Sequence, residues 1–231
     1  MKIRAASGFN LIDYPGKIAA MVFAPGCNYK CPACHAKPLL NEDALVDEEE
    51  FFKYLDSVRQ WVNGVVICGG EPTMQDGLLP FLRRLKAARL PVKLDTNGSA
   101  PEVLTALLAE NLADYVAMDV KGPRNLWPNI AGTPDSAEAM LESMRAAARF
   151  PDHEFRTTIV PVVRSGGDGQ ADSGYHRKRR PQIFHTEIRA QKERPAGRAA
   201  GEFSRNAAGT AGRDEEGGFG LPAQVRNKRI T

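Results

Sequence analysis

Short apolar runs alternate with helical patterns from about residue 18 to residue 160 of this chain. A strand, a helix and a second strand in that order form a right-handed βαβ unit, and successive units build a parallel sheet. The pattern therefore predicts an α/β protein, folded either as a partial (β/α) barrel or as a doubly wound sheet. The expected strands are Ile18–Phe23, Gly64–Cys68, Val92–Leu94, Tyr115–Val120 and Phe155–Val160, and the expected helices are Asp47–Trp61, Leu78–Leu90, Val103–Asn111 and Ser136–Phe150.

Ligands bind at the carboxyl ends of the strands in both of these folds. Polar or reactive motifs follow four of the five expected strands, so we expect them to meet at one edge of the sheet. The motifs are Cys27–Cys34, Gly69–Pro72, Asp95–Gly98 and Met118–Lys121.

Three cysteines, Cys27, Cys31 and Cys34, lie within eight residues directly after the first expected strand. Three thiolates can bind three irons of a [4Fe–4S] cluster and leave the fourth iron open to a chelating ligand. The alternatives are a structural zinc site, with His35 or Cys68 as its fourth ligand, and plain thiols. His35 adjoins Cys34, and neighbouring residues seldom reach one ion, so the open cluster is the favoured interpretation.

The second motif is Gly69-Gly-Glu-Pro72. Gly69 and Gly70 would let the backbone approach a ligand closely, and Glu71 could accept hydrogen bonds from an ammonium group. A simple turn explains the same residues equally well.

The remaining two motifs are less specific. Asp95 and Asn97 lie in Asp-Thr-Asn-Gly, which offers polar groups to a ligand but is also an ordinary turn sequence. Asp119 and Lys121 could act together in a site or form only a surface ion pair of little energetic value.

The cysteine loop resembles the signature of the radical S-adenosylmethionine superfamily. Members usually carry an aromatic residue just before the last cysteine, where this chain has Ala33, and that difference removes no ligand. The resemblance implies a partial (β/α) barrel with a [4Fe–4S] cluster on the three cysteines and S-adenosylmethionine on its open iron. It also implies that the cofactor's amino group meets Gly69, Gly70 and Glu71, its ribose Asp95 or Asn97, and its carboxylate Asp119 and Lys121; Arg156 and Thr158 are weaker candidates.

Four further segments resemble the activating proteins of anaerobic ribonucleoside-triphosphate reductases: Gly8–Lys17, Lys93–Gly98, Asp114–Lys121 and Phe155–Pro161. This likeness implies an enzyme that reductively cleaves S-adenosylmethionine and generates a glycyl radical on a partner enzyme. A flavodoxin or ferredoxin would supply the electron. The alternatives are another glycyl-radical partner such as pyruvate formate-lyase, a small-molecule substrate, or a zinc or iron–sulfur module that only binds a partner.

The character of the chain changes near residue 165. Residues 1–166 carry a net charge of −2 and residues 167–231 one of +5, and ten of the 21 glycines lie in that second part. We therefore expect a core over residues 1–165 and a basic, glycine-rich tail of low order over residues 166–231.

The family likeness stops abruptly at about residue 164, which leads to a hypothesis about the gene. If codons chosen for residues 182–190 are shifted by one base, they encode the strand-like sequence Lys-Tyr-Phe-Ile-Leu-Lys-Phe-Val-Pro. The tail would then be a frameshifted translation, and the barrel would lack its last strand. A genuine disordered basic tail is the alternative.

Several functional classes are disfavoured by the rest of the sequence. The longest apolar run, Ile18–Pro25, is too short to cross a bilayer, and Met1–Arg4 is not followed by an apolar signal core. The cysteine spacing does not resemble a secreted disulfide framework. The basic character belongs to the tail, so it gives no reason to expect a nucleic-acid partner. We therefore expect a cytoplasmic protein.

Overall fold

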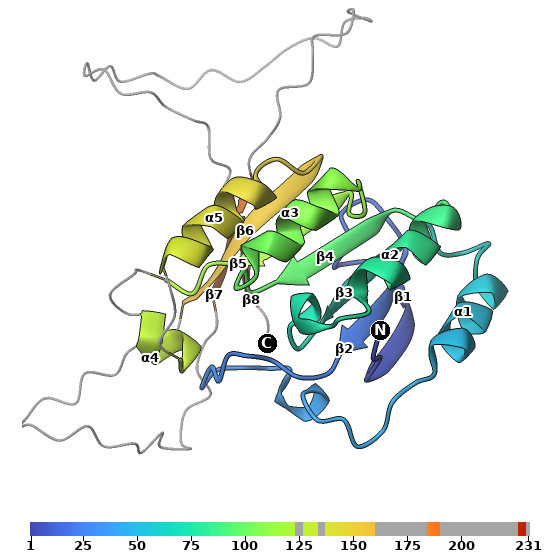
Figure 1. Ribbon diagram of the computed structural model, residues 1–231, viewed down its shortest axis with the longest axis horizontal. Coiled ribbons are helices and arrows are strands. Elements are labelled where there is room, and N and C mark those ends of the chain that lie inside the picture. The colour runs from blue at the N-terminus through green and yellow to red at the C-terminus, as the bar shows by residue number, and fades with distance from the viewer. Residues whose placement is uncertain (123–126, 134–136, 160–183, 190–225, 230–231) are drawn as a thin grey trace, which may run out of the picture.

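The computed structural model describes residues 1–122, 127–133, 137–159, 184–189 and 226–229 (Figure 1). Its centre is a run of five neighbouring parallel strands in chain order, which confirms the predicted βαβ architecture. The strands are β2 (Ala19–Ala24), β3 (Gly64–Gly69), β4 (Val92–Thr96), β5 (Tyr115–Asp119) and β6 (Asp152–Ile159).

Antiparallel strands extend this sheet at both ends. The strand β1 (Ala5–Asn10) pairs with β2, while β7 (Phe184–Arg189) pairs with β6 and β8 (Arg226–Arg229) pairs with β7. Within the described residues β8 does not pair back to β1, so the sheet is open. Two tail segments therefore form strands, and the outer edge of β6 is paired. Because β7 runs antiparallel, it does not continue the parallel βα series.

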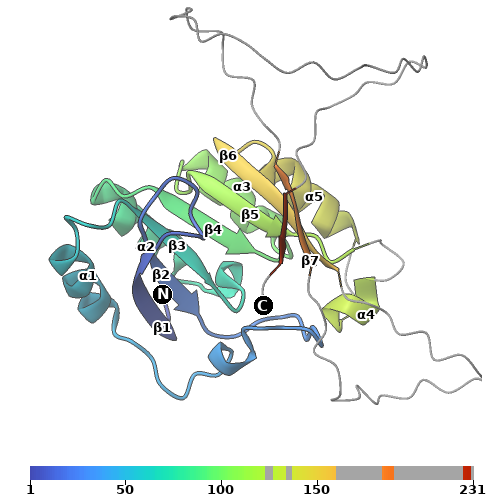
Figure 2. The same ribbon diagram turned by 180° about the vertical axis from the view of Figure 1, so that it is seen from behind.

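Helices cover one face of the parallel strands. The helices α2 (Leu78–Ala87), α3 (Pro101–Ala109) and α5 (Ala137–Ala147) lie in front of the sheet in Figure 1, and the opposite view shows a face without them (Figure 2). The other helical segments are α1 (Glu48–Ser57), α4 (Trp127–Ala131) and the short turns η1 (Lys37–Leu39) and η2 (Pro72–Met74). No helix in the described ranges has the length and apolarity needed to span a membrane.

The helix boundaries follow from local chemistry. Asp47, where the first expected helix begins, caps α1: its side chain accepts hydrogen bonds from the backbone N–H groups of Glu49 and Glu50 at 2.9 and 3.1 Å. The helices α2 and α3 end earlier than the apolar periodicity predicts, because Arg89 and Asn111 adopt left-handed conformations with φ of 55° and 53°. At each end a backbone N–H closes the turn that is typical of a Schellman cap. Ser136 and Val160, predicted to begin a helix and end a strand, lie outside the described residues.

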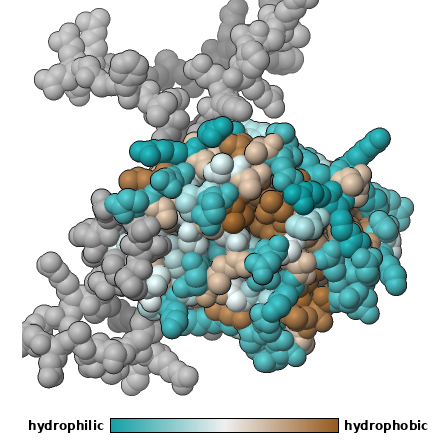
Figure 3. All heavy atoms as spheres, viewed as in Figure 1, coloured by the Kyte–Doolittle hydropathy of each residue, from teal (hydrophilic) through white to brown (hydrophobic). Residues whose placement is uncertain are grey.

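The two faces of the sheet bury different side chains. The larger apolar core fills the space between the sheet and the helices and includes Ile67, Leu94 and Val116. The smaller cluster lies on the helix-free face and contains Tyr14, Ala19, Met21, Val66, Tyr115 and Ala117. From the helix side the surface is largely hydrophilic with smaller apolar patches (Figure 3).

Side chains alternate along a strand, so the partners of this smaller cluster on β4 are Lys93 and Asp95 rather than Val92 and Leu94. The helix-free face is therefore partly apolar and partly charged. The residues predicted to bind a cofactor lie at the carboxyl edge of this sheet.

Candidate functional site

The cysteine loop follows β2 and is fixed by backbone hydrogen bonds. The N–H of Gly26 donates to the carbonyl of Leu40 at 2.9 Å, and the N–H of Lys30 donates to that of Ala131, the last residue of α4, at 2.9 Å. Gly132 permits this approach, because a Cβ at that position would lie 2.5 Å from the Lys30 carbonyl oxygen. The loop is therefore attached to the rest of the fold on both sides of Cys27.

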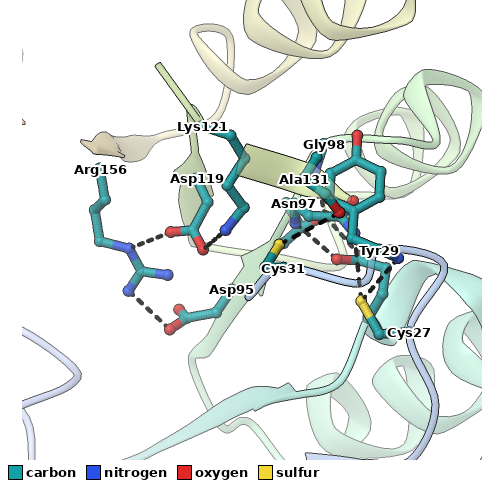
Figure 4. A network of polar contacts seen from close by, with 12 residues as sticks. Cys27, Tyr29, Cys31, Asp95, Asn97, Gly98, Asp119, Lys121, Ala131 and Arg156 are labelled. Atoms are coloured by element: carbon teal, nitrogen blue, oxygen red, sulfur yellow. Dashed lines mark hydrogen bonds and ion pairs between the residues drawn. The ribbon is translucent and has the colours of Figure 1, made fainter. Parts of the chain in front are cut away.

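Cys27, Cys31 and Cys34 are half-buried and carry free thiols. Burial raises the pKa of the Cys27 thiol, while the Tyr29 N–H, 3.4 Å from its sulfur, acts in the opposite direction. Burial also raises the pKa of the Cys31 thiol, against the effect of the positive charge of Lys121. The sulfur of Cys31 donates to the Ala131 carbonyl at 3.7 Å (Figure 4).

The donor set fits an iron–sulfur cluster by its chemistry. Three thiols lie on one short loop, and the charges of Cys31 and Cys34 act on the pKa of Cys27. Within the described part of the chain, no three Cys, His, Asp or Glu side chains are already gathered around one point. His35, the candidate fourth zinc ligand, is exposed.

Gly69 and Gly70 bring the end of β3 into contact with the segment that leads to Cys27. The N–H of Gly70 donates to Ala24 and that of Glu71 to Gly26, both at 2.8 Å. A Cβ on Gly70 would lie 1.7 Å from the Gly26 carbonyl oxygen. In this structure the two glycines thus serve a close approach between two backbone segments, and their expected contact with a ligand stays a prediction.

The carboxylate of Glu71 is buried and joins the ends of β3 and β4. It accepts hydrogen bonds from the N–H and hydroxyl of Thr73 at 3.1 and 2.6 Å, from the Thr96 hydroxyl at 2.7 Å and from the Asn97 N–H at 2.7 Å. Burial raises its pKa, although these hydrogen bonds oppose that effect. Its side chain therefore braces the fold here, and its expected contact with an ammonium group stays a prediction.

Asn97 connects the end of β4 to the cysteine loop. Its amide nitrogen donates to the Asn28 side-chain oxygen at 2.8 Å and lies 3.8 Å from the sulfur of Cys27, to which it also donates. Its amide oxygen accepts the N–H of Ser99 at 2.9 Å. Asn97 thus lies next to the first predicted cluster ligand.

Asp95 and Asp119 belong to a chain of charges across β4, β5 and β6 (Figure 4). Lys121 binds Asp119 at 2.8 Å, and Arg156 binds both Asp119 and Asp95. Burial acts to raise the pKa of Asp119, but the charges of Arg156 and Lys121 outweigh it and lower that pKa. Burial acts to lower the pKa of Lys121, but the charge and hydrogen bond of Asp119 outweigh burial and raise that pKa.

The charge chain continues through residues that sequence reasoning missed. Lys93 is 1% exposed and binds Asp95 at 2.5 Å, with Glu154 at 3.8 Å. The hydroxyl of Tyr115 donates to the other oxygen of Glu154 at 2.8 Å. The signal was a lysine and a glutamate within otherwise buried strands, since buried charges are usually paired.

The fourth cysteine lies apart from the loop. Cys68 is on the helix-free face beside Met21 and Val66, and burial raises the pKa of its thiol well above the usual value. Cys68, the other candidate fourth zinc ligand, is therefore partly buried among apolar side chains.

The four predicted motifs therefore meet at one edge of the sheet. The chain is 46% identical over 159 residues to a Methanocaldococcus jannaschii protein named "Putative glycyl-radical enzyme activating enzyme", covering 66% of this chain and 65% of that protein. It is 31% identical over 122 residues to a 7-carboxy-7-deazaguanine synthase of Clostridium acetobutylicum, covering 51% of this chain and 53% of that protein. The chain thus spans about half to two thirds of these relatives.

Among solved structures, QueE from Escherichia coli matches 64% of this chain and 87% of its own, with a TM-score of 0.38 and 16% identity. The model of the radical SAM superfamily matches residues 21–165, a range that contains the cysteine loop and the other three motifs. The chain therefore belongs to the radical S-adenosylmethionine superfamily, whose enzymes use a [4Fe–4S] cluster and S-adenosylmethionine.

Proposed function

We propose that this chain is an activating enzyme that cleaves S-adenosylmethionine reductively and generates a glycyl radical on a partner enzyme. The observation that carries the proposal is the meeting of the cysteine loop with polar residues at the carboxyl edge of the sheet, where Asn97 donates to the Cys27 sulfur at 3.8 Å and Lys121 binds Asp119 at 2.8 Å. The 46% identity to the Methanocaldococcus jannaschii protein supports the activating role.

In this proposal one set of residues binds the iron–sulfur cluster and another set binds S-adenosylmethionine. Cys27, Cys31 and Cys34 would bind the cluster, whose reduced form supplies the electron that splits S-adenosylmethionine into methionine and a 5′-deoxyadenosyl radical. The protein contributes orientation and electrostatics rather than the radical chemistry itself. The positive charge of Lys121 suits a carboxylate, and Asp119 keeps that lysine in place.

Three other groups complete the proposed cofactor site. Asp95 and Asn97 can accept hydrogen bonds from hydroxyl groups, and the backbone of Gly69 and Gly70 lies at the same edge of the sheet. The buried carboxylate of Glu71 contributes by fixing Asn97, to whose N–H it is bonded.

The finer parts of this function concern partners and location. We infer that the partner is the anaerobic ribonucleoside-triphosphate reductase, on the strength of the segments that resemble its activating proteins, and that a flavodoxin or ferredoxin is the electron donor. Cytoplasmic location follows from the need to keep the cluster-binding thiols reduced.

Anaerobic reconstitution of the full chain with iron and sulfide tests the proposal. We expect cluster absorbance that is lost on reduction, together with 5′-deoxyadenosine formed from S-adenosylmethionine. Replacing Cys31 by Ala should abolish both signals, while replacing Cys68 by Ala should preserve them, because Cys68 lies apart from the loop. Stoichiometric zinc without 5′-deoxyadenosine would refute the proposal.

The identity of the partner is tested separately. The reconstituted chain should generate the electron paramagnetic resonance signal of a glycyl radical on anaerobic ribonucleotide reductase, with pyruvate formate-lyase as the comparison. A glycyl-radical signal on pyruvate formate-lyase alone would identify that enzyme, rather than the reductase, as the partner. Formation of 5′-deoxyadenosine without a radical on either protein would point to a small-molecule substrate.

A further inference from the structure

One guanidinium joins carboxylates from two different strands at the proposed cofactor site. The Nε of Arg156 lies 3.1 Å from an oxygen of Asp119, and its Nη1 lies 2.9 Å from an oxygen of Asp95 (Figure 4). The arginine is on β6, Asp119 on β5 and Asp95 on β4, so one side chain spans three strands. Arginine suits this role because its donors form a rigid planar fork.

The strand register explains how Arg156 reaches so far. Arg156 is opposite Asp119, whereas Asp95 is opposite Ala117, whose other neighbour is Glu154. Ala117 is fully buried on the same face, and its methyl group is the only side chain that β5 places between Asp95 and Glu154. The small residue leaves room for the guanidinium to cross β5.

The charges on either side cannot replace this contact. Among the residues that the structure describes, Lys121 binds Asp119, while Lys93 binds Asp95 and approaches Glu154, so neither lysine is seen to link the two aspartates. Without Arg156 the carboxylates of Asp95 and Asp119 would face each other from neighbouring strands and repel, because like charges in a partly buried site are poorly screened.

We propose that Arg156 is a positioning residue that holds Asp95 and Asp119 at a fixed spacing, so that these carboxylates and Lys121 meet S-adenosylmethionine as one rigid polar surface. This inference rests on the proposed function. It assigns Arg156 no contact with the cofactor. Its effect is to pre-organise groups that would otherwise have to be ordered when the cofactor binds.

The test is the affinity of the reconstituted full chain for S-adenosylmethionine, measured from the change that the cofactor produces in the electron paramagnetic resonance spectrum of the reduced cluster. Replacing Arg156 by Met should weaken binding about tenfold or more, and replacing it by Lys should restore only part of the loss, since one ammonium cannot hold both carboxylates. The matched control is Arg83→Met, which removes an exposed pair with Glu110 on the helix side.

A second variant leaves every charge in place. Ala117→Val adds two methyl groups between Asp95 and Glu154, and we expect it to weaken cofactor binding in the same direction as Arg156→Met. If Arg156→Met does not fold, Ala117→Val still tests the positioning role of Arg156. In steady-state assays the variants should raise KM more than they lower kcat.

The outcomes separate this inference from the function on which it rests. If the unmodified chain forms a cluster but no 5′-deoxyadenosine, the proposed function fails. If the unmodified chain is active and both Arg156→Lys and Ala117→Val bind the cofactor as tightly as Arg83→Met does, the positioning role is overturned.

Discussion

A single amide connects the polar edge of the sheet to the first cysteine. Asn97 and the Tyr29 backbone both donate to the Cys27 sulfur, at 3.8 and 3.4 Å. Hydrogen bonds to cluster sulfurs stabilise the reduced, more negative state and thereby raise the reduction potential. If Cys27 is a ligand, Asn97 influences how readily the cluster accepts an electron.

We therefore expect Asn97→Ala to lower the reduction potential of the reconstituted cluster. A potentiometric titration followed by electron paramagnetic resonance measures this directly, without any turnover. The control is Asn41→Ala, whose exposed side chain is bonded to Arg4 and Asp43 rather than to a cysteine. Equal potentials in the two variants would remove Asn97 from the environment of the cluster.

Glu71 is a second residue whose effect can be measured without the cofactor. Glutamine in its place keeps the volume but directs an amide N–H₂ toward a backbone or hydroxyl donor, leaving at least one buried donor unsatisfied. We expect Glu71→Gln to reduce the free energy of unfolding by about 1–3 kcal/mol, as measured by chemical denaturation of the apo chain. The exposed Glu102→Gln should change little, and equal stability of the two variants would contradict the bracing role.

At the scale of elements, the end of β3 and the start of the cysteine loop depend on each other. Gly70 is not in the left-handed region, so alanine there adds a clash with the Gly26 carbonyl rather than backbone strain. Gly16 is the opposite case, because its φ is +73° and nothing lies within 4 Å of an added Cβ. The two glycines therefore separate the effect of a clash from that of strain.

Gly70→Ala should move the segment before Cys27 and reduce the iron bound per chain after reconstitution. Gly16→Ala should cost about 1–2 kcal/mol of stability through backbone strain and leave iron binding intact. Iron and sulfide analysis of the two proteins checks this prediction. Full iron content in Gly70→Ala would show that the loop tolerates the displacement.

Five parallel strands and four helices could be predicted from the sequence because their apolar periodicity agrees with their burial. β1 was missed because Gly8 and the left-handed Phe9, with φ of 58°, interrupt its pattern and its pairing with β2 shifts register there. α4 was missed because five residues are too few for periodicity to show. β7 was missed although Phe184, Thr186 and Ile188 alternate with polar residues, which is a strand signal within a polar tail.

The same reasoning explains what could be predicted of the site. Each motif follows a strand, and parallel strands end at one edge, so the meeting of Cys27, Asn97 and Asp119 at that edge could be inferred. The hydrogen-bond and ion-pair partners of individual side chains could not be inferred from the sequence. Which oxygen Arg156 binds depends on the register between β4, β5 and β6 and on the small size of Ala117, and neither follows from spacing along the chain.

At the scale of the molecule, the sheet separates two kinds of interior. Its helix side carries the larger apolar core, while the helix-free face combines a smaller apolar cluster with three cations and three carboxylates in contact: Lys93, Lys121, Arg156, Asp95, Asp119 and Glu154. Buried charges lower stability unless they are paired. The helix-free face can therefore carry these charges only while the six side chains stay paired with one another.

The part of the chain that matches the family and the tail after it differ in composition, and under the frameshift hypothesis only the first part is translated in the original reading frame. The family match ends at residue 165, and residues 167–231 hold ten glycines and a net charge of +5. Such a composition buries little apolar surface. We therefore predict that resequencing the locus will reveal one missing or extra base near codon 167, and that the restored frame encodes an apolar strand and helix that continue the βα series.

A chain expressed from the restored frame should be more stable to chemical denaturation than the present one, because a further βα unit would bury more apolar surface against β6 and α5. The measurement compares the two unfolding transitions at equal protein concentration. An unbroken reading frame would instead mean that the basic tail is genuine. In that case the antiparallel strands β7 and β8 are the native continuation of the sheet, and deleting residues 160–231 should destabilise the core by exposing the edge of β6.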